Sequence, residues 1–232
     1  MKENSPSCIR FGVCYFCPVC RSADLSKDGR TANDKQRYKC KKCSKRFITE
    51  YSYNACKQAI NQKIVTFTKE GLGIRSTARV LKISTNTLLK RIHLISDNIE
   101  IPPVSKGKTY EVDEMRIFIG KKTRLRWIVY ALERESGRVV SFNVGRRTNR
   151  TLWRVIRALE LSEAKKIYTD RLKNYRYLIE RKVHSTMLYG TNHIERMNLT
   201  LRTRLKRLSR RTICFGRSLT VCVAILRICF WG

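Results

Sequence analysis

The chain has 232 residues, of which 42% are apolar, enough to bury the core of one large domain or of two to three small ones. Fifty Lys and Arg side chains against 18 Asp and Glu give a formal charge of +32, and this self-repulsion favours a polyanionic partner, above all nucleic acid. No stretch reaches the ~18 to 20 apolar residues of a membrane span, and the first residues lack the apolar core of a secretory signal. We therefore expect no membrane partner and a location in the cytoplasm, over the nucleoid.

Residues 1–53 are the first predicted domain, which is rich in Cys, Lys and turn-forming residues and too short to build a core alone. Two C-x-x-C pairs separated by 19 residues have the spacing of a structural zinc site with four thiolate ligands: Cys17, Cys20, Cys40 and Cys43. In a reducing cytosol such pairs indicate metal binding rather than disulfides. The sequence thus predicts a zinc ribbon that folds on Zn²⁺. Cys14 lies three residues before the first ligand and stays open as an alternative ligand.

Residues 54–96 are the second predicted domain, in which apolar residues recur at the helical period in three short runs. A turn at Ile83-Ser84 separates the last two runs, with Ser84 or Thr85 as the cap of the third helix. This pattern predicts a helix-turn-helix domain. Its third helix would offer five residues to the major groove or the phosphates of double-stranded DNA: Thr85, Asn86, Thr87, Lys90 and Arg91.

Residues 97–108 contain two prolines and a glycine and are predicted to be a linker, and residues 109–232 are the third predicted domain. Strand-like patterns occupy 110–120, 124–133, 138–146 and 165–170, and helical patterns occupy 149–161, 173–182, 192–210 and 213–230. Three strands, a helix, a strand and further helices is the element order of a ribonuclease-H-like domain. The predicted fold class is therefore α/β and multidomain, with a zinc ribbon and a helix-turn-helix followed by a ribonuclease-H-like mixed-sheet catalytic domain.

Acidic residues are scarce in this chain, so their positions carry information. Asp113 lies inside the first strand of the third domain, Asp170 ends the fourth strand, and Glu195 opens a later helix. Three carboxylates placed in this way can converge on two Mg²⁺ ions, with Mn²⁺ as a possible substitute, and so support phosphodiester chemistry. The neighbouring Glu111 and Glu114 are predicted to point to the opposite face of the strand from Asp113. Ordinary solvated carboxylates are the competing interpretation.

Several motifs of the chain resemble the insertion sequence 1 (IS1) family of bacterial transposases. The resemblance covers nearly the whole chain through CPVC, CKKC, GLGIRSTARVLKIS, VDEM, YTD and NHIERMNLTLRTRLKRL. Members of this family are DDE transposases, and their catalytic triad carries onto Asp113, Asp170 and Glu195. The 24 residues between the last two acids are similar to the spacing in the family.

The resemblance implies a DNA transposase that binds the inverted-repeat ends of an insertion sequence. Strand cleavage would depend on Mg²⁺ and would be followed by transfer of the 3′-hydroxyl into target DNA. A basic residue seven positions after the glutamate is common in related enzymes, and Arg202 occupies that position, with Lys206 beside it and Arg196 as a further DNA-binding candidate. The resemblance also implies a homo-oligomer on DNA, so that two ends are cut in register.

One residue departs from the family pattern, because Arg171 follows the second aspartate where a small residue, typically glycine, is usual. A large cation there can compete with Mg²⁺ for Asp170 or obstruct the approach of DNA. A catalytically decayed copy, or a regulator that binds the element ends without cleaving them, therefore stays open as the alternative function. A zinc-ribbon ribosomal protein would explain the charge but not the spacing of the three acids.

Overall fold

The computed structural model describes residues 15–50, 52–57 and 59–232. The chain forms two compact units that divide after Lys57. The domain boundaries drawn from the sequence stay a prediction. Within the described residues, no helix has both the length and the apolar character needed to cross a membrane.

The first unit is a small antiparallel sheet beside a cysteine cluster. Its three strands, in the order β1-β2-β3, are β1 (Leu25–Arg30), β2 (Gln36–Cys40) and β3 (Arg46–Ile48). Four buried side chains form its core, which is small for a unit of this length: Cys17, Tyr38, Cys40 and Phe47. The two buried cysteines place the cluster inside this core, as expected for a unit that needs more than apolar packing to be stable.

The first unit ends with a short 3₁₀ helix (Asn54–Cys56). The second unit begins with the three helices that the apolar periodicity predicts: α1 (Ile60–Lys69), α2 (Ile74–Leu81) and α3 (Thr85–Asn98). The α2–α3 turn is tight because Lys82 adopts a left-handed conformation with φ of 52°. Ser84 then caps α3, since its hydroxyl accepts a hydrogen bond from the Thr87 backbone N–H at 3.0 Å. The predicted helix-turn-helix region is confirmed.

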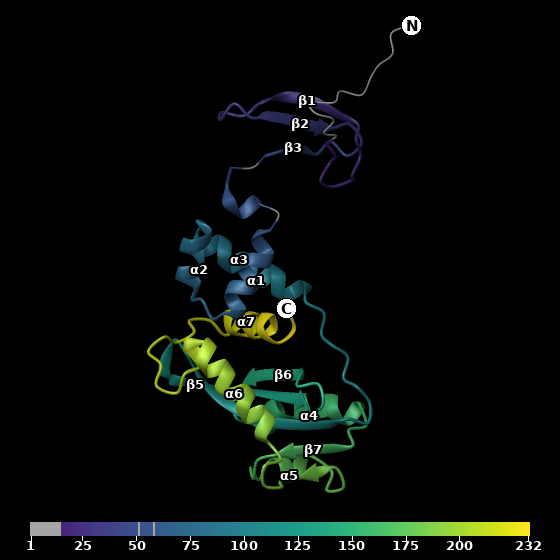
Figure 1. Ribbon diagram of the computed structural model, residues 1–232, viewed down its shortest axis with the longest axis vertical. Coiled ribbons are helices and arrows are strands. Elements are labelled where there is room, and N and C mark those ends of the chain that lie inside the picture. The colour runs from purple at the N-terminus through teal and green to yellow at the C-terminus, as the bar shows by residue number, and fades with distance from the viewer. Residues whose placement is uncertain (1–14, 51, 58) are drawn as a thin grey trace. The chain divides into compact units, whose positions relative to one another are not determined.

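The remainder of the second unit is built on a five-stranded mixed sheet (Figure 1). Its strands are β4 (Thr109–Ile119), β5 (Lys121–Glu133), β6 (Val139–Gly145), β7 (Lys166–Thr169) and β8 (His184–Ser185). The order is β6-β5-β4-β7-β8, with antiparallel pairing from β6 to β4 and parallel pairing from β4 to β8. Three antiparallel strands continued by parallel ones are the ribonuclease-H-like arrangement, and the predicted α/β fold class is confirmed.

Helices cover both faces of this sheet. The helices are α4 (Asn149–Leu161), α5 (Tyr175–Leu178), α6 (Asn192–Arg204) and α7 (Leu219–Trp231). On one face α4 buries its apolar side against Tyr110, Val112 and Val129 of the central strands. On the other face α6 crosses β4 and β5, and α7 stacks Phe230 on Tyr130 of β5 with 5.6 Å between the ring centroids. Alternate residues of β4 therefore face different helices.

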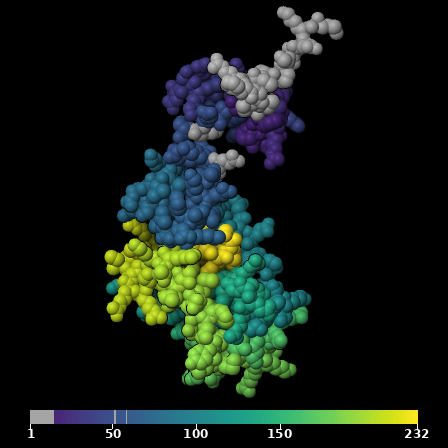
Figure 2. All heavy atoms as spheres, viewed as in Figure 1, coloured from purple at the N-terminus to yellow at the C-terminus, as the bar shows by residue number. Residues whose placement is uncertain are grey.

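Helix α7 also packs against the helix-turn-helix, principally against α3 and α1. The Arg227 guanidinium donates to the backbone oxygen of Ile99 at 3.0 Å, and the Cys229 thiol lies 3.9 Å from the Thr68 oxygen. In the space-filling view the atoms of α1–α3 lie directly against those of the C-terminal segment (Figure 2). One apolar helix thus has the sheet on one side and the helix-turn-helix on the other.

Three predicted helices are shorter than their sequence patterns indicate. Helix α6 ends at Arg204 rather than at residue 210. The other two are shortened where the chain joins the sheet. The pattern over 173–182 gives only the four residues of α5, because the chain then turns into β8 and His184 pairs with Ile167 of β7. The last helix begins at Leu219 rather than near 213, because Gly216 bridges to Ile119 and Ser218 caps α7. In both places sheet pairing overrides local helical periodicity.

Gly71 provides a test of how the helix-turn-helix is held. It adopts a φ of +80°, and a Cβ atom added there would clash with the backbone oxygen of Arg204 at the end of α6. We expect Gly71→Ala to lower the free energy of unfolding by about 2 kcal/mol or more, because it combines backbone strain with a backbone clash. Urea denaturation measures this.

Gly73→Ala is the matched control, since a Cβ atom added there would meet no atom within 4 Å beyond its chain neighbours, and its φ is −68°. Equal stability of the two variants would contradict the packing of Gly71 on α6.

Candidate active site and metal centres

The four predicted zinc ligands come together in the first unit. The sulfur atoms of Cys17, Cys20, Cys40 and Cys43 all lie within 4.8 Å of one another. The backbone N–H of Cys20 lowers the pKa of Cys17 to about 6, and that of Cys43 lowers the pKa of Cys40. Four converging sulfurs, two of them favoured as thiolates, fit Zn²⁺. Cys14 lies outside the described residues.

The two cysteine pairs have the same local geometry. In each, the residue directly after the second cysteine is left-handed, with φ of 56° at Arg21 and 57° at Ser44. These turns redirect the chain at the end of each C-x-x-C segment so that both sulfurs of a pair face the same point. The C-x-x-C spacing predicted this convergence. It did not predict the left-handed turns, because Arg21 and Ser44, rather than glycines, occupy those positions.

A second group of metal-binding side chains forms where β4 and β7 run side by side. Val112 pairs with Thr169, which puts Asp113 next to Asp170 at the end of β7. Carboxylate oxygens of Asp113, Asp170 and Glu114 all lie within 4.8 Å of one another. Carboxylates at this separation repel each other, and oxygen donors of this kind fit Mg²⁺ or Mn²⁺.

Asp113 is held firmly while Asp170 is open to solvent. Asp113 accepts hydrogen bonds from the Asn198 amide at 2.6 Å and from the Glu114 backbone N–H at 2.7 Å. Burial raises the pKa of Asp113, and the charges of Asp170 and Glu195 raise it further. Asp170 is exposed and accepts from the Leu172 backbone N–H at 3.0 Å. One carboxylate is therefore preorganised, and the other faces the side from which a substrate can arrive.

Glu195 lies in the first turn of α6 and is exposed. Its carboxylate accepts a hydrogen bond from the Thr191 hydroxyl at 3.1 Å. It is near enough to raise the pKa of Asp113, but it does not belong to the group of carboxylates within 4.8 Å. The structure therefore brings the first two predicted triad residues together and leaves the third adjacent.

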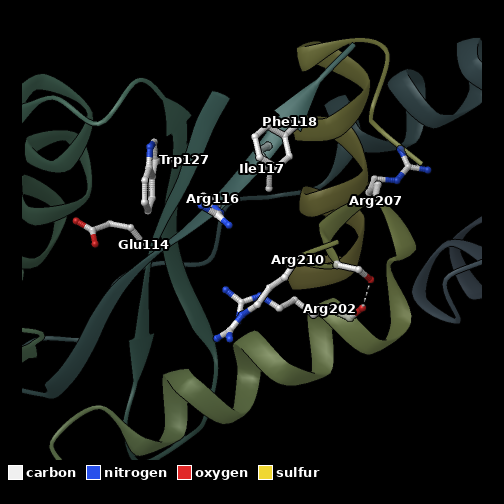
Figure 3. A pocket seen from close by; sticks show the side chains of 9 residues that line it. Glu114, Arg116, Ile117, Phe118, Trp127, Arg202, Arg207 and Arg210 are labelled. Atoms are coloured by element: carbon white, nitrogen blue, oxygen red, sulfur yellow. Dashed lines mark hydrogen bonds between the residues drawn. The ribbon is translucent and has the colours of Figure 1, made fainter. Parts of the chain in front are cut away.

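The predicted orientation of Glu111 is wrong. Glu111 and Asp113 are two residues apart on β4 and both face α6, as strand alternation requires. Glu111 is fully buried and accepts from the Ile194 backbone N–H at 2.9 Å and from His193 at 2.6 Å. It thereby satisfies the N-terminus of α6, the helix that carries Glu195. Glu114 does point the other way, as predicted (Figure 3).

A basic pocket of about 310 Å³ opens beside these acids (Figure 3). Glu114 lines one side of it, together with apolar and polar residues and four arginines: Arg116, Arg202, Arg207 and Arg210. The side chains of Arg202 and Arg210 extend toward the same point. Burial lowers the pKa of Arg202, as does the charge of Arg210, and the Arg202 Nε is buried without a partner among the described residues. Four arginines against one lining carboxylate leave the pocket with an excess of positive charge that favours an anion.

Of these four, the sequence predicted Arg202 as a DNA contact and noted Arg210 as its basic neighbour, but it did not indicate Arg116 or Arg207. Arg116 lies on β4, and Arg207 and Arg210 follow α6 in and beyond a short 3₁₀ helix (Lys206–Leu208). No spacing rule joins a strand residue to a loop so distant in the sequence, and their convergence therefore required the structure. The other two predicted basic contacts near α6, Arg196 and Lys206, are exposed and do not line the pocket.

The five predicted DNA-binding residues of α3 lie on its N-terminal half. Thr85, Asn86 and Lys90 are placed there with Thr87 and Arg91, and Thr85 and Asn86 are exposed. The Arg91 guanidinium donates to the Asn61 side chain of α1 at 3.4 Å. This half of α3 therefore presents short polar side chains to solvent beside cations, which is what a groove-reading helix requires.

Arg171 is exposed beside Asp170. Among the ion pairs of residues 15–50, 52–57 and 59–232, none joins these two side chains. Asp170 thus keeps its carboxylate available in spite of the neighbouring cation.

Comparison with known proteins yields matches to two family models. The model described as "IS1 transposase" matches residues 108–227, and the model described as "InsA C-terminal domain" matches residues 51–94. The insertion element iso-IS1n protein InsB of Shigella dysenteriae is 38% identical over 111 residues, which are 48% of this chain and 85% of that protein. The iso-IS1N protein InsA of the same organism is 36% identical over 80 residues, 34% of this chain and 89% of that protein.

Among solved structures, a chain in the cryoEM structure of the simian T-cell lymphotropic virus intasome in complex with PP2A regulatory subunit B56 gamma is similar at a TM-score of 0.37. The two are 17% identical, and the match covers 71% of this chain and 66% of that one.

The cysteine cluster can be tested by removing one buried sulfur. We expect Cys40→Ser to release the bound zinc, from about one ion per chain to near none, and to leave residues 15–57 open to proteolysis, because metal binding supplies the folding free energy of such a unit. Zinc is measured by a colorimetric chelator and folding by limited trypsin digestion.

Cys56→Ser is the control, because Cys56 is exposed and outside the cluster. Full zinc content in the Cys40 variant would show that the four sulfurs are not a zinc site.

Proposed function

The chain belongs to the IS1 transposase family, and on that premise we propose that it is a DNA transposase that binds the inverted-repeat ends of an insertion sequence and cuts and joins DNA strands with divalent metal ions. The observation that supports this most is the meeting of Asp113 and Asp170 across β4 and β7, with Glu195 on the adjacent helix. Double-stranded DNA, both the element ends and the target, is the proposed partner and matches the charge of +32.

The proposed catalytic and metal-binding residues are Asp113, Asp170 and Glu195. Two Mg²⁺ or Mn²⁺ ions held by carboxylates would activate the attacking water or 3′-hydroxyl and stabilise the departing oxygen. Asn198 holds Asp113 in place through a hydrogen bond of 2.6 Å, and Glu111 anchors the first turn of α6. These buried contacts fix the acids before DNA arrives, so little reorganisation is needed at the moment of reaction.

We propose that DNA is held at two places on the second unit. The N-terminal half of α3 reads or grips the element end through five residues: Thr85, Asn86, Thr87, Lys90 and Arg91. Close to the acids, the basic pocket around Arg202 takes a phosphate of the strand that reacts, and the exposed Arg196 and Lys206 extend the contact. The unpartnered Nε of Arg202 supports an anion there.

The zinc site is proposed to be structural. Its four ligands are Cys17, Cys20, Cys40 and Cys43, and with one Zn²⁺ it leaves no coordination position open for a substrate. Lysines in and beside the C-x-x-C segments, such as Lys41 and Lys42, offset the negative charge of the four thiolates. A homo-oligomer assembled on DNA in the cytoplasm is part of the same proposal.

A decayed copy or a regulator is the second candidate, and Arg171 is the observation that favours it. A cation beside Asp170 lowers the local attraction for metal ions even without a direct ion pair. Such a protein would bind the element ends and leave them uncut.

Cleavage separates the two candidates. We expect the protein to nick a labelled duplex carrying the element's terminal repeats only when Mg²⁺ is present, and Asp170→Asn to reduce nicking on the order of a thousandfold or more, because the catalytic groups act as a unit. Asp97→Asn, at an exposed acid of α3, should leave the rate unchanged. Gel analysis of the products measures each rate.

Arg171→Gly completes this experiment. Binding without nicking that this substitution restores identifies a decayed enzyme, whereas binding without nicking in every variant contradicts the catalytic proposal and leaves the regulator.

The basic pocket has its own test. We expect Arg202→Gln with Arg210→Gln to weaken DNA binding for all sequences alike and to reduce the slope of log affinity against log salt by about 0.9 for each phosphate that is no longer neutralised. Fluorescence anisotropy over a salt series measures the slope. Arg138→Gln, at an exposed arginine in the β5–β6 turn, is the control, and equal slopes in all three proteins would remove the pocket from the DNA path.

A further inference from the structure

Glu114 is a buried acid whose carboxylate is only half satisfied. Its side chain is 1% exposed, and its Oε2 lies 3.5 Å from an Arg147 nitrogen. Its Oε1 is buried and has no hydrogen-bond partner among the described residues. The buried Tyr175 hydroxyl is the nearest possible donor, but no hydrogen bond of regular geometry joins it to Glu114. A buried carboxylate oxygen without a regular hydrogen bond is costly, and a cation beside it would offset that cost.

The position of this oxygen shows what kind of ligand fits. Glu114 points to the α4 side of the sheet, yet its carboxylate reaches the edge where β7 ends and comes within 4.8 Å of Asp113 and Asp170. Glu195, the third acid of the triad, is outside this group. Two neighbouring strands therefore bring three carboxylates together without Glu195, while Asn198 of α6 holds Asp113 in place.

The charges nearby do not neutralise the three acids. Arg147 is half-exposed, stands at the long end of ion-pair distance from Glu114, and also lies over the Trp127 ring at 4.5 Å. The carboxylates of Asp113, Glu114 and Asp170 lie within 4.8 Å of one another and repel each other. A small divalent cation coordinated by all three carboxylates would relieve this repulsion better than the Arg147 guanidinium, which pairs with Glu114 alone.

We propose that Glu114 is a third carboxylate ligand, with Asp113 and Asp170, of a divalent-metal site that fills without DNA and without Glu195. The inference rests on the proposed function only in identifying the metal as the one used for strand cleavage. Glu195 then belongs to a second metal position, completed on the α6 side. Glu114 lies outside the triad that the family comparison implies, so it adds a metal ligand to this site.

Binding of Mn²⁺ to the zinc-loaded, DNA-free full chain tests the inference without any cleavage assay. Electron paramagnetic resonance of free Mn²⁺ gives the affinity of each site. We expect Glu114→Gln, which keeps the shape of the side chain, to weaken the tighter site roughly tenfold or more, since removing a group that merely supports a metal ligand already costs that much. Glu195→Gln should change this site by less than about threefold.

Two further variants separate ligation from general effects. Glu133→Gln removes a buried acid of β5 outside the cluster and should leave Mn²⁺ affinity unchanged. Arg147→Gln removes the ion pair but keeps the carboxylate, so Mn²⁺ should bind equally or more tightly. If the carboxylate of Glu114 served only its ion pair, both Glu114→Gln and Arg147→Gln would lower thermal stability alike while Mn²⁺ affinity stayed at the wild-type value.

The outcomes distinguish this inference from the proposed function. Wild-type Mn²⁺ affinity in folded Glu114→Gln overturns the inference, even if DNA is cleaved. A weakened site in Glu114→Gln supports it, even if no variant cleaves DNA. Equal weakening by Glu195→Gln and Glu114→Gln also overturns it, because the site would then need the Glu195 carboxylate.

Discussion

The attachment of α6 to β4 by buried polar groups is the constraint on which the active-site region depends. Glu111 accepts the Ile194 N–H at the start of the helix, and Asp113 accepts the Asn198 amide one turn further on. The Tyr130 hydroxyl of β5 adds a third contact by donating to Asn198 at 2.9 Å. Each of these polar groups would be costly to bury without a partner, so the hydrogen bonds between the sheet and α6 stabilise both elements. Glu111 and Asp113 therefore hold α6 in place, and Asp113 is also a candidate metal ligand.

Within the strongly cationic second unit, a group of acids on β4 and at the end of β7 lies near a group of arginines. Glu114 lines the same pocket as the arginines, but Figure 3 shows its carboxylate turned away from Arg202 and Arg210. Each group contains a buried polar atom without a hydrogen-bond partner among the described residues, Glu114 Oε1 among the acids and Arg202 Nε among the arginines. A metal-bound phosphodiester, as in the proposed function, would supply both charges.

The sequence predicted those features that local periodicity or spacing determines. Helix α4 begins at Asn149 and ends at Leu161, the bounds its apolar pattern indicates, and the C-x-x-C pairs predicted the convergence of four sulfurs. Features that depend on pairing between distant segments were missed: β8, the late start of α7 and the pocket around Arg202. Strand alternation was sufficient to place Glu111 beside Asp113, and the prediction for Glu111 failed because that rule was misapplied. The sequence also did not predict that Glu114 lies near Asp113 and Asp170. Strand alternation places Glu114 on the opposite face of β4, but its side chain is long enough to bring the carboxylate within 4.8 Å of the other two.

Helix α7 connects the two parts of the second unit that we propose face DNA. Its Phe230 packs on Tyr130, whose hydroxyl contacts α6, while its other side contacts α3 and α1. A rotation of the helix-turn-helix would have to move α7, and α7 cannot move without disturbing the ring stack above the active-site strand. Packing through one helix thus connects α3 with Asn198 and Asp113. Under the proposed function, this connection would let the reading of an element end by α3 affect the geometry of the acids.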